Sequence, residues 1–323
     1  MITRTNPTRF LPAFIALFLL VHAGCKHNPA NAPLTFYDFE GDVTQFNTAY
    51  RDFILYGTFP GPGLAIVKND GSGNQFIDTP LLAFGGTWSP RKWKIFYLAD
   101  TAVGPASPGL YLINVDGTGN RRVTPSSERI CAAACAPDGQ KIAYSVYDSV
   151  GRTKIKIIKP DGSGARDITG FILSNQFSKL SWSPDSRQIA FDGSRYSGGI
   201  WGIGYVVVES GFVASLFPPE GQQCYTPDWS HDGMKIAYIT YSSVERTMYS
   251  NVFYYSLVTQ KSYQVTSRKA AAFAPHWSPD SRQIIFGSQD YDGSGSHLYS
   301  VNMDGSGLVQ LTAGSEYVSY PDW

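Results

Sequence analysis

The chain has 323 residues, of which 43% are hydrophobic and 14% aromatic, and it contains 26 basic and 26 acidic residues. Because the two charges are equal in number, no net field attracts a phosphate backbone, and we expect no nucleic-acid partner. Glycine (32) and proline (20) together make up about a sixth of the residues, a composition typical of many short strands joined by turns.

The first 24 residues have the features of an export signal. Two arginines precede an apolar stretch from Leu11 to Val21, and two small residues stand before Cys25. This end resembles the bacterial lipobox, in which the cysteine is lipidated and becomes the mature N-terminus, although His22 stands where leucine is usual. Ordinary signal cleavage and a short transmembrane anchor are the alternatives. We expect a signal over 1–24, a polar tether over 25–35 and a folded body over 36–323.

Three cysteines remain beyond this segment, Cys131, Cys135 and Cys224. An odd number in an exported chain argues against a disulfide framework. Cys131 and Cys135 lie four residues apart on one predicted strand, about 13 Å at about 3.3 Å per residue, which is too far for a disulfide. We expect buried thiols.

One pattern recurs along the body. Its five copies are TWSPRKWKIFY (87–97), ACAPDGQKIAY (134–144), SWSPDSRQIAF (181–191), DWSHDGMKIAY (228–238) and HWSPDSRQIIF (276–286). The second position of each copy, followed by Trp323 at the start of a sixth, advances in steps of 47, 47, 47, 48 and 46 residues. A period of this size indicates a supersecondary unit that buries its faces only by stacking on its neighbours.

Each copy predicts four strands. A short strand ends at the tryptophan, a Ser-Pro-Asp-Gly type turn follows, and an alternating apolar segment completes a hairpin. A third strand then closes in Asp-Gly-Ser/Thr-Gly and leads to a fourth that ends in threonine. Four copies of that turn begin at Asp70, Asp116, Asp161 and Asp304, and the closing threonines are Thr124, Thr169, Thr266 and Thr312.

The two ends of the chain complete one unit. Residues 66–79 match its second half, Tyr320–Trp323 match its first strand, and Phe53–Gly57 supply the second strand. We therefore predict an all-β fold, a six-bladed β-propeller of four-stranded antiparallel blades, closed by pairing of the C-terminal strand with the N-terminal blade. The recurring tryptophans are expected to be wedges between blades.

Some copies depart from the pattern. Cys135 replaces the tryptophan of the second copy, and Lys92 and Trp93 alter the first turn. The third and fourth copies have VVESGF and LVTQKS in place of Asp-Gly-Ser-Gly. We expect distorted turns within intact blades.

The repeated turn, the apolar strand after it and the closing Leu-Thr resemble the PD40, or TolB-type, subclass of WD40-like propellers, from about residue 40 to the end. The same repeat occurs in TolB, in propellers attached to prolyl peptidases and in oligogalacturonate lyases, so the resemblance implies a fold more than a function. TolB carries a folded α/β domain before its propeller, and the residues after Cys25 are too few for one. The resemblance implies a free-standing propeller on a lipid tether.

Catalytic and metal signatures are weak. The chain has no separate hydrolase domain with Gly-x-Ser-x-Gly, and His231, His276 and His297 lack metal-ligand spacing. The first two histidines are expected to serve turn or inter-blade packing. Asp290 and Asp292 resemble the opening of a calcium loop, but a valine stands at its twelfth position. We expect no metal and no cofactor.

Candidate binding residues lie in the loops between second and third strands and between successive blades, which share the mouth of the channel. Tyrosine and arginine, which are enriched in binding hot spots, are frequent there. The candidates are Tyr147, Asp148, Arg152, Arg195, Tyr196, Tyr241, Arg246, Arg268, Asp290, Tyr291, Asp292, Glu316 and Tyr317.

The leading hypothesis is a non-enzymatic, monomeric propeller that is lipid-anchored to a bacterial membrane, faces the periplasm or the cell surface, and binds an envelope protein or peptide over the channel mouth. One alternative is a carbohydrate-active, lyase-like enzyme, for which Asp148, Asp290, Asp292 and Glu316 are the candidate carboxylates. Another is a propeller that binds glycan or a small ligand, which stacked tyrosines would favour.

Overall fold

The computed structural model describes residues 46–59, 63–100, 108–148, 152–170, 179–193, 202–217, 223–244, 247–289, 295–314 and 317–323, all within the compact unit Phe36–Trp323. These residues form strands β1 to β24 and one 3-10 helix, η2 (Thr48–Tyr50). Among them, no helix is long and apolar enough to cross a membrane. The predicted signal, the tether and Cys25 lie outside the described residues.

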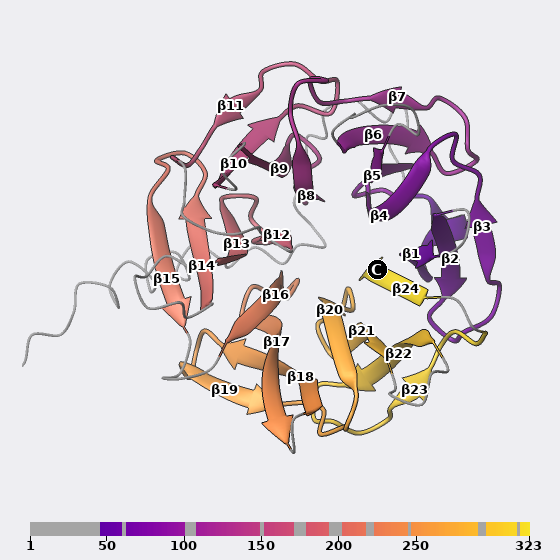
Figure 1. The fold of residues 1–323 in the computed structure, drawn as a ribbon, viewed down its shortest axis with the longest axis vertical. Coiled ribbons are helices and arrows are strands. Elements are labelled where there is room, and N and C mark those ends of the chain that lie inside the picture. Colours follow the sequence, from indigo (N-terminus) through magenta and orange to yellow (C-terminus); the bar gives the residue numbers. More distant parts are fainter. Residues whose placement is uncertain are drawn as a thin grey trace, which may run out of the picture. The chain divides into compact units, whose positions relative to one another are not determined.

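Four of the sheets contain four antiparallel strands each (Figure 1). The first has the order β24 (Tyr317–Asp322), β1 (Phe53–Phe59), β2 (Leu64–Lys68), β3 (Gln75–Ile77), and the second has the order β4 (Leu82–Trp88), β5 (Lys94–Asp100), β6 (Gly109–Asn114), β7 (Arg121–Arg122). The third runs β8 (Ile130–Cys135), β9 (Ile142–Tyr147), β10 (Thr153–Ile158), β11 (Arg166–Asp167), and the fourth β12 (Leu180–Trp182), β13 (Gln188–Gly193), β14 (Gly202–Val207), β15 (Val213–Phe217).

The remaining strands form one eight-stranded sheet. They are β16 (Cys224–Trp229), β17 (Lys235–Val244), β18 (Thr247–Ser256), β19 (Lys261–Gln264), β20 (Ala271–Trp277), β21 (Gln283–Gln289), β22 (Ser296–Asn302) and β23 (Val309–Gln310). A single parallel pair, Ser250 with Ala271, joins β18 to β20. The architecture is therefore an all-β propeller of antiparallel sheets. Four separate four-stranded blades are present, rather than the six predicted, because this contact merges the last two repeats.

The two ends of the described unit share a sheet. Strand β24 pairs antiparallel with β1, with Gly57 opposite Ser319 and Thr58 opposite Val318. This confirms that Phe53–Gly57 and the C-terminal strand belong together. On its other side β24 contacts β20, β21 and β22, and it also contacts β4. In Figure 1 the strands β4, β8, β12, β16, β20 and β24 lie innermost.

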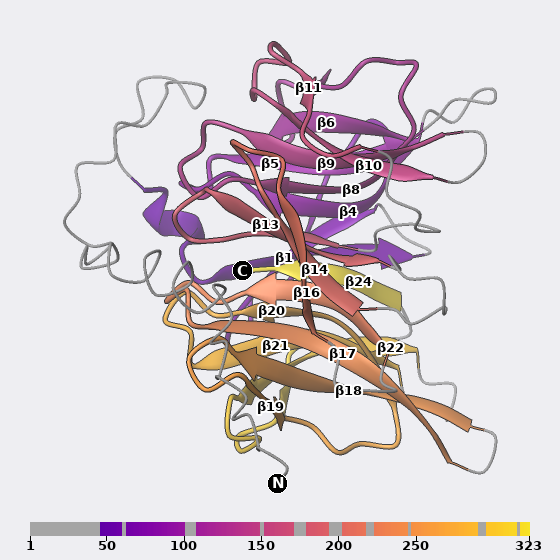
Figure 2. The ribbon, with the colours of Figure 1, turned by 90° about the vertical axis from the view of Figure 1, so that its left-hand side faces the viewer.

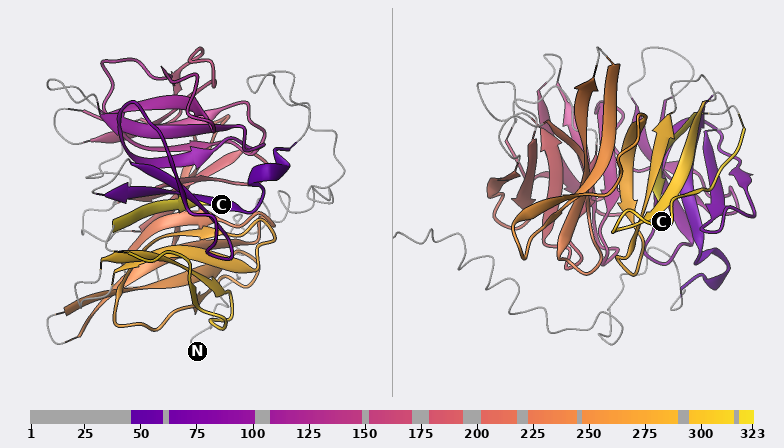
Figure 3. Two further views of the ribbon diagram at one scale, coloured as in Figure 1. Left: turned by 90° about the vertical axis from the view of Figure 1, so that its right-hand side faces the viewer. Right: turned by 90° about the horizontal axis from the view of Figure 1, so that it is seen from below.

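The strands run between two faces, as the side views show (Figures 2 and 3). Second strands are buried along most of their length, as in β13 and β21, because both sides of each sheet are covered by neighbours. The inner strand β8 alternates buried and half-buried residues. The hairpin of β17 and β18 is the longest, with ten residue pairs, and extends past its neighbours in Figure 2.

A serine hydroxyl organises the turn after four of the inner strands, β4, β12, β16 and β20, whereas Ala136 stands at this position after β8. Ser183, Ser230 and Ser278 each accept the N–H of the residue five positions on at 2.9 Å and donate to an aspartate two positions on at 2.6 Å. The third residue after the serine has positive φ in every copy, including Lys92 at 57°. The Lys92 N–H bonds to the Ser89 carbonyl oxygen at 2.9 Å, as in the other copies. The expected distortion of this first turn is therefore wrong.

The two other irregular turns do differ. Gly211 and Gln260 donate their N–H to the carbonyl oxygen four positions back, whereas Gly71 of an Asp-Gly-Ser-Gly turn donates three positions back. Their sheets keep four strands, since β15 pairs with β14 and β19 with β18. The turns of these two repeats are one residue longer, and their four strands are intact, as predicted.

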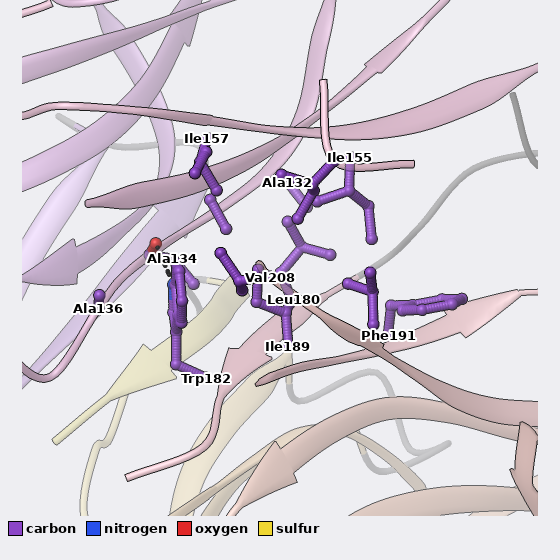
Figure 4. Packing of buried hydrophobic residues seen from close by; sticks show 13 residues of the cluster. Ala132, Ala134, Ala136, Ile155, Ile157, Leu180, Trp182, Ile189, Phe191 and Val208 are labelled. Atoms are coloured by element: carbon purple, nitrogen blue, oxygen red, sulfur yellow. Dashed lines mark hydrogen bonds between the residues drawn. The ribbon is translucent and has the colours of Figure 1, made fainter. Parts of the chain in front are cut away.

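The tryptophans are wedges, as predicted. Trp88, Trp182, Trp229, Trp277 and Trp323 are all at most 9% exposed. Trp182 lies beside Ala134 of the preceding sheet, and its indole N–H donates to the Ala134 carbonyl oxygen at 2.9 Å (Figure 4). The same cluster includes Ile157, Ile189 and Val208, so it is shared between two sheets.

Candidate functional site

We call the mouth face the face at which second strands end and the next inner strands begin. Large apolar side chains are exposed on strands that end or begin at this face, three of them at the strand ends (Phe59, Leu82 and Tyr317) and two within the strands (Tyr241 and Tyr320). They are Phe59 (65% exposed), Leu82 (54%), Tyr317 (45%), Tyr320 (43%) and Tyr241 (41%). Phe59 and Tyr317 are a register pair on β1 and β24. We refer to these five residues as the mouth patch.

Tyr320, on the inner strand β24, has neighbours from three other sheets. Its neighbours with electrostatic effect are Asp192 on β13, Cys131 on β8 and Tyr241 on β17. Burial raises the pKa of Tyr320, and these three groups raise that pKa further. The side chain nevertheless remains 43% exposed. Groups from three other sheets thus lie near a ring that stays accessible to solvent, which suits a residue that contacts a ligand.

The backbone explains why Tyr320 points inward. It has a φ of 41°, precedes Pro321, and lies at an irregularity in the pairing of β24 with β1. Thr226 and Ala274 stand at the same position of β16 and β20, also with positive φ and also before proline. This recurring bulge re-aims one side chain of an inner strand. Tyr320 is large where Thr226 and Ala274 are small.

A buried carboxylate supports the neighbouring bulge. Asp192 is 1% exposed and its Oδ2 accepts the Thr226 N–H at 2.9 Å. Close by, the rings of Tyr225 and Tyr241 make an edge contact with centroids 5.2 Å apart. Burial raises the pKa of Tyr225 to about 12, with Tyr241 and Asp192 adding to the rise. The Tyr225 hydroxyl is therefore neutral at physiological pH, and it donates to Gln223 Oε1 at 2.6 Å.

Six of the residues predicted from the sequence lie in the described part of the mouth face. Tyr241 and Tyr317 belong to the mouth patch. Asp148 and Arg152 pair with each other at 2.7 Å across the end of the β9–β10 hairpin. The Arg129 guanidinium stacks over the Tyr147 ring at 4.3 Å. The partly buried Arg268 guanidinium stacks over the Tyr299 ring at 4.5 Å, a packing position between strands.

Seven predicted residues fall outside the described residues, and their roles stay predictions. They are Arg195, Tyr196, Arg246, Asp290, Tyr291, Asp292 and Glu316.

A second cluster of polar groups lies deeper, on the inner strands. We call Lys179, Asp228, His276 and Asp322 the inner charge cluster. The Lys179 ammonium is 2.8 Å from Asp228 Oδ1, and His276 Nε2 is 2.7 Å from Asp322 Oδ1. All four are at most 16% exposed at the side chain.

The inner charge cluster also ties sheets together through backbone amides. Asp228 Oδ2 accepts the Trp277 N–H at 2.8 Å, and Asp322 Oδ2 accepts the Trp88 N–H at 2.6 Å. Ser181 Oγ accepts the Trp229 N–H at 2.8 Å in the same way. In these three cases the residue before one tryptophan binds the backbone of the tryptophan in the next repeat. His276, which precedes Trp277, instead contacts Asp322 of the adjacent sheet, and this gives it the predicted inter-blade packing role.

Metal and thiol chemistry find little support. In the described ranges no group of three or more His, Cys, Asp or Glu side chains is arranged to hold a metal ion. Cys131, Cys135 and Cys224 form no disulfide in the part of the chain that the structure describes. Cys224 is buried, and burial raises the pKa of its thiol to about 12. Cys131 and Cys135 are half-buried rather than buried, because they point to the less covered side of β8.

Sequence reasoning missed Phe59, Leu82, Tyr225 and Tyr320 at the mouth face. The missed residues lie on strands, whereas the sequence search concentrated on loops. For Tyr320 a signal existed, since the Tyr-Pro-Asp-Trp end differs from Thr-Pro-Asp-Trp at residues 226–229 by one large side chain at the bulge.

Comparisons with known proteins point to one family. Residues 205–323 match the PD40 model, described as the TolB beta propeller domain. The Tol-Pal system protein TolB of Alcanivorax borkumensis is 23% identical over 151 residues, which is 45% of this chain and 34% of that protein.

Solved structures share the fold. TolB from Acinetobacter baumannii aligns with a TM-score of 0.69 and 19% identity, over 84% of this chain and 66% of that one. An oligogalacturonate lyase in complex with manganese aligns with a TM-score of 0.58 and 15% identity, over 82% of this chain and 75% of that one. The chain therefore spans about a third of the curated TolB relative and just under two thirds of the solved TolB chain.

Proposed function

We propose that this chain, a TolB-type PD40 β-propeller, is a non-enzymatic module that binds an envelope protein or peptide over its mouth face. The observation that carries the proposal is the mouth patch. Five large apolar side chains, each at least 41% exposed, lie on strands β1, β4, β17 and β24, and Phe59, Leu82 and Tyr317 are at the ends of theirs. Contiguous exposed apolar surface marks interaction sites, and tyrosines are frequent among the residues that dominate binding energy.

The chemistry of the patch suits a protein partner. Phe59, Leu82 and Tyr317 offer apolar area at strand ends, and Tyr320 and Tyr241 add aromatic rings, with the Tyr320 hydroxyl kept neutral by its raised pKa. A rigid sheet scaffold presents these side chains with little conformational entropy to lose on binding. The envelope setting is inferred from the relative named as part of a Tol-Pal system.

The same proposal includes the finer architecture. In this proposal the eight-stranded sheet consists of two blades that are linked by the Ser250–Ala271 contact. The propeller is then a closed ring of six blades, with β24 as the closing strand. The module acts as a monomer. Size-exclusion chromatography with light scattering tests this, and a mass of two or more chains would contradict it.

The proposed location is a bacterial membrane, facing the periplasm or the cell surface, through lipid on Cys25 after removal of residues 1–24. The lipobox-like end of the apolar stretch supports this. The mass of the mature N-terminal peptide tests it. A peptide that starts at Cys25 with added acyl chains supports the anchor, and an unmodified N-terminus contradicts it.

The binding proposal is tested by immunoprecipitation of the full-length chain from a detergent extract of the cells that express it. A Phe59→Ser, Tyr317→Ser double variant removes the rim of the mouth patch. Phe212→Ser is the matched control, because Phe212 is also exposed (46%) but sits in the β14–β15 turn at the other end of the strands.

A protein retained by the wild type and by Phe212→Ser but lost by the double variant supports the proposal. Retention of the same proteins by all three chains contradicts it. Capture of nothing by the wild type contradicts it as well and moves the question to a glycan array, because the fold is shared with an oligogalacturonate lyase.

The carbohydrate-active alternative has less support. Of its candidate carboxylates, Asp148 is already engaged by the Arg152 guanidinium at 2.7 Å, and the other three lie outside the described residues. A general acid and base need two carboxyl groups that face one substrate. Turnover of pectic or other acidic glycans by the purified chain is the measurement that would favour this alternative.

A further inference from the structure

The inner charge cluster contains a histidine whose two ring nitrogens both face acceptors. His276 Nε2 lies 2.7 Å from the carboxylate oxygen Oδ1 of Asp322. His276 Nδ1 lies 3.0 Å from the carbonyl oxygen of Trp277. Neither oxygen carries a hydrogen, so both nitrogens must donate. Only the imidazolium has a hydrogen on both nitrogens.

The surroundings favour the same charged form. Asp322 on β24 and Asp228 on β16 carry two negative charges, with Asp228 Oδ1 3.7 Å from His276 Nε2. Lys179, which precedes β12, supplies one positive charge. The imidazolium supplies the second and makes the buried cluster neutral, whereas a neutral imidazole would leave a net negative charge in a site where charge is costly.

The remaining titratable groups near the cluster do not supply this charge. His231, in the turn after β16, has its ring centroid 6.4 Å from that of His276. Burial and the nearby His276 lower the pKa of His231, so it is neutral. Lys92, in the turn after β4, also interacts electrostatically with Asp322, but its ammonium is bonded outside the cluster, to the carbonyl oxygens of Arg51 and Phe53.

The position of His276 gives this charge a mechanical consequence. Asp322 is the last residue of β24, and its other oxygen is held by the Trp88 N–H of β4. The chain therefore ends in a strand that is fixed on one side by β4 and on the other by His276 of β20. We propose that the His276 imidazolium is a pH-sensitive latch that holds the C-terminal strand β24 in place.

The direction of the pH effect follows from the environment of the ring. Burial alone lowers the pKa of His276, but Asp228 and Asp322 outweigh burial and raise that pKa above its ordinary value of 6.5. The latch is therefore fully closed below about pH 6.5 and opens as pH rises through the higher pKa of the folded state. His276 also lowers the pKa of Asp322 below its ordinary value of 3.8, so the Asp322 carboxylate becomes protonated, and its contact with His276 is lost, only below pH 3.8. The latch is therefore fully closed between about pH 3.8 and pH 6.5.

Strand β24 also carries Tyr317 and Tyr320 of the mouth patch. Opening of the latch would loosen both side chains and weaken binding at the mouth. This consequence rests on the proposed function, but the latch itself does not.

The test is hydrogen–deuterium exchange of the full chain, followed on peptides that cover residues 317–323 and corrected for the pH dependence of the intrinsic exchange rate. Protection of these amides is expected to fall by up to about tenfold per pH unit between pH 6.5 and the higher pKa of His276 in the closed state, because opening the latch releases one proton over that range. Amides of β2, paired on the far side of β1, are the internal reference.

Two variants separate the latch from general stability. His276→Gln is expected to remove the pH dependence of the 317–323 peptides. His297→Gln is the matched control, because His297 is a second buried histidine (8% exposed), on β22 of the same sheet. It is expected to keep the wild-type pH dependence.

Wild-type protection that stays constant with pH overturns the latch, and so does an unchanged pH dependence in His276→Gln. Should His276→Gln fail to fold, NMR titration of the wild-type imidazole decides. A His276 pKa above 6.5 supports the latch, and a value at or below 6.5 refutes it. No partner is needed in any of these measurements, so their failure is distinguishable from failure of the proposed function.

Discussion

Lys92 offers a quantitative test of how the first turn is built. Its side chain is 4% exposed, and its ammonium donates to the carbonyl oxygens of Phe53 at 2.7 Å and Arg51 at 3.0 Å. The ammonium also lies 5.3 Å from the centroid of the Trp88 ring. No carboxylate is bonded to it in the described residues, so the charge is solvated by carbonyl dipoles and a π face.

Burial lowers the pKa of Lys92 from 10.5 to about 8, although Asp322 and Asp52 oppose the decrease. Between these two values the unfolded chain binds a proton that the folded chain does not, so stability rises with pH across this range. At about 1.4 kcal/mol per pKa unit, the effect is about 3 kcal/mol. Lys92→Met lacks the titrating group and lacks this effect.

The assay is urea denaturation of the wild type and of Lys92→Met at pH 7.5 and pH 10.5. The free energy of unfolding of the wild type, taken relative to the variant, is expected to increase by about 3 kcal/mol at the higher pH. Lys94→Met, which removes a half-buried lysine after the same turn, controls for the loss of one positive charge. A difference between wild type and Lys92→Met that is equal at both pH values would refute the burial of the ammonium.

Two further substitutions test the inner charge cluster and the packing of a sheet. Asp228→Ala leaves the buried ammonium of Lys179 without its carboxylate and is expected to lower the free energy of unfolding by about 3–5 kcal/mol. Asp228→Asn keeps a hydrogen-bond acceptor and is expected to lower it by less. Equal losses for the two variants in urea denaturation would contradict the role of the charge. Gly287→Ala places a methyl carbon 2.0 Å from the Phe273 ring and is expected to cost about 1–3 kcal/mol in the same assay, while Gly170→Ala, with nothing within 4 Å, is expected to be near neutral. Equal stability of the two alanine variants would show that the Phe273 ring moves aside freely.

The repeat was readable from the sequence because each copy solves the same local problem with the same residue types. The serine, aspartate and positive-φ positions of the turn are fixed by backbone geometry, and the tryptophan is fixed by the gap between sheets. The altered first copy was misjudged for a physical reason. Lys92 adopts a φ of 57°, like Ser186 and Ser281 at the same turn position, and carbonyl oxygens of Arg51 and Phe53, far away in sequence, hold its ammonium in the interior.

The number of separate sheets was less accessible. The single Ser250–Ala271 pair that merges two repeats depends on how closely two strands approach, which a pattern of residue types does not specify. Five of the thirteen predicted binding residues, Tyr147, Asp148, Arg152, Tyr241 and Arg268, already have described partners or packing contacts, so loop position alone did not separate structural from available side chains.

By itself, the sequence determined the all-β repeat, its turns, its tryptophan wedges and the pairing of the two chain ends, because these depend on short-range geometry that recurs every 46 to 48 residues. Only the tertiary structure decided which side chains meet at the centre. Tyr320, Asp192, Cys131 and Tyr241 come from four sheets, and Asp228, His276 and Asp322 come from three inner strands. Such meetings depend on the stacking of whole sheets, and no spacing along the chain encodes the distance between residues on strands that lie across a ring.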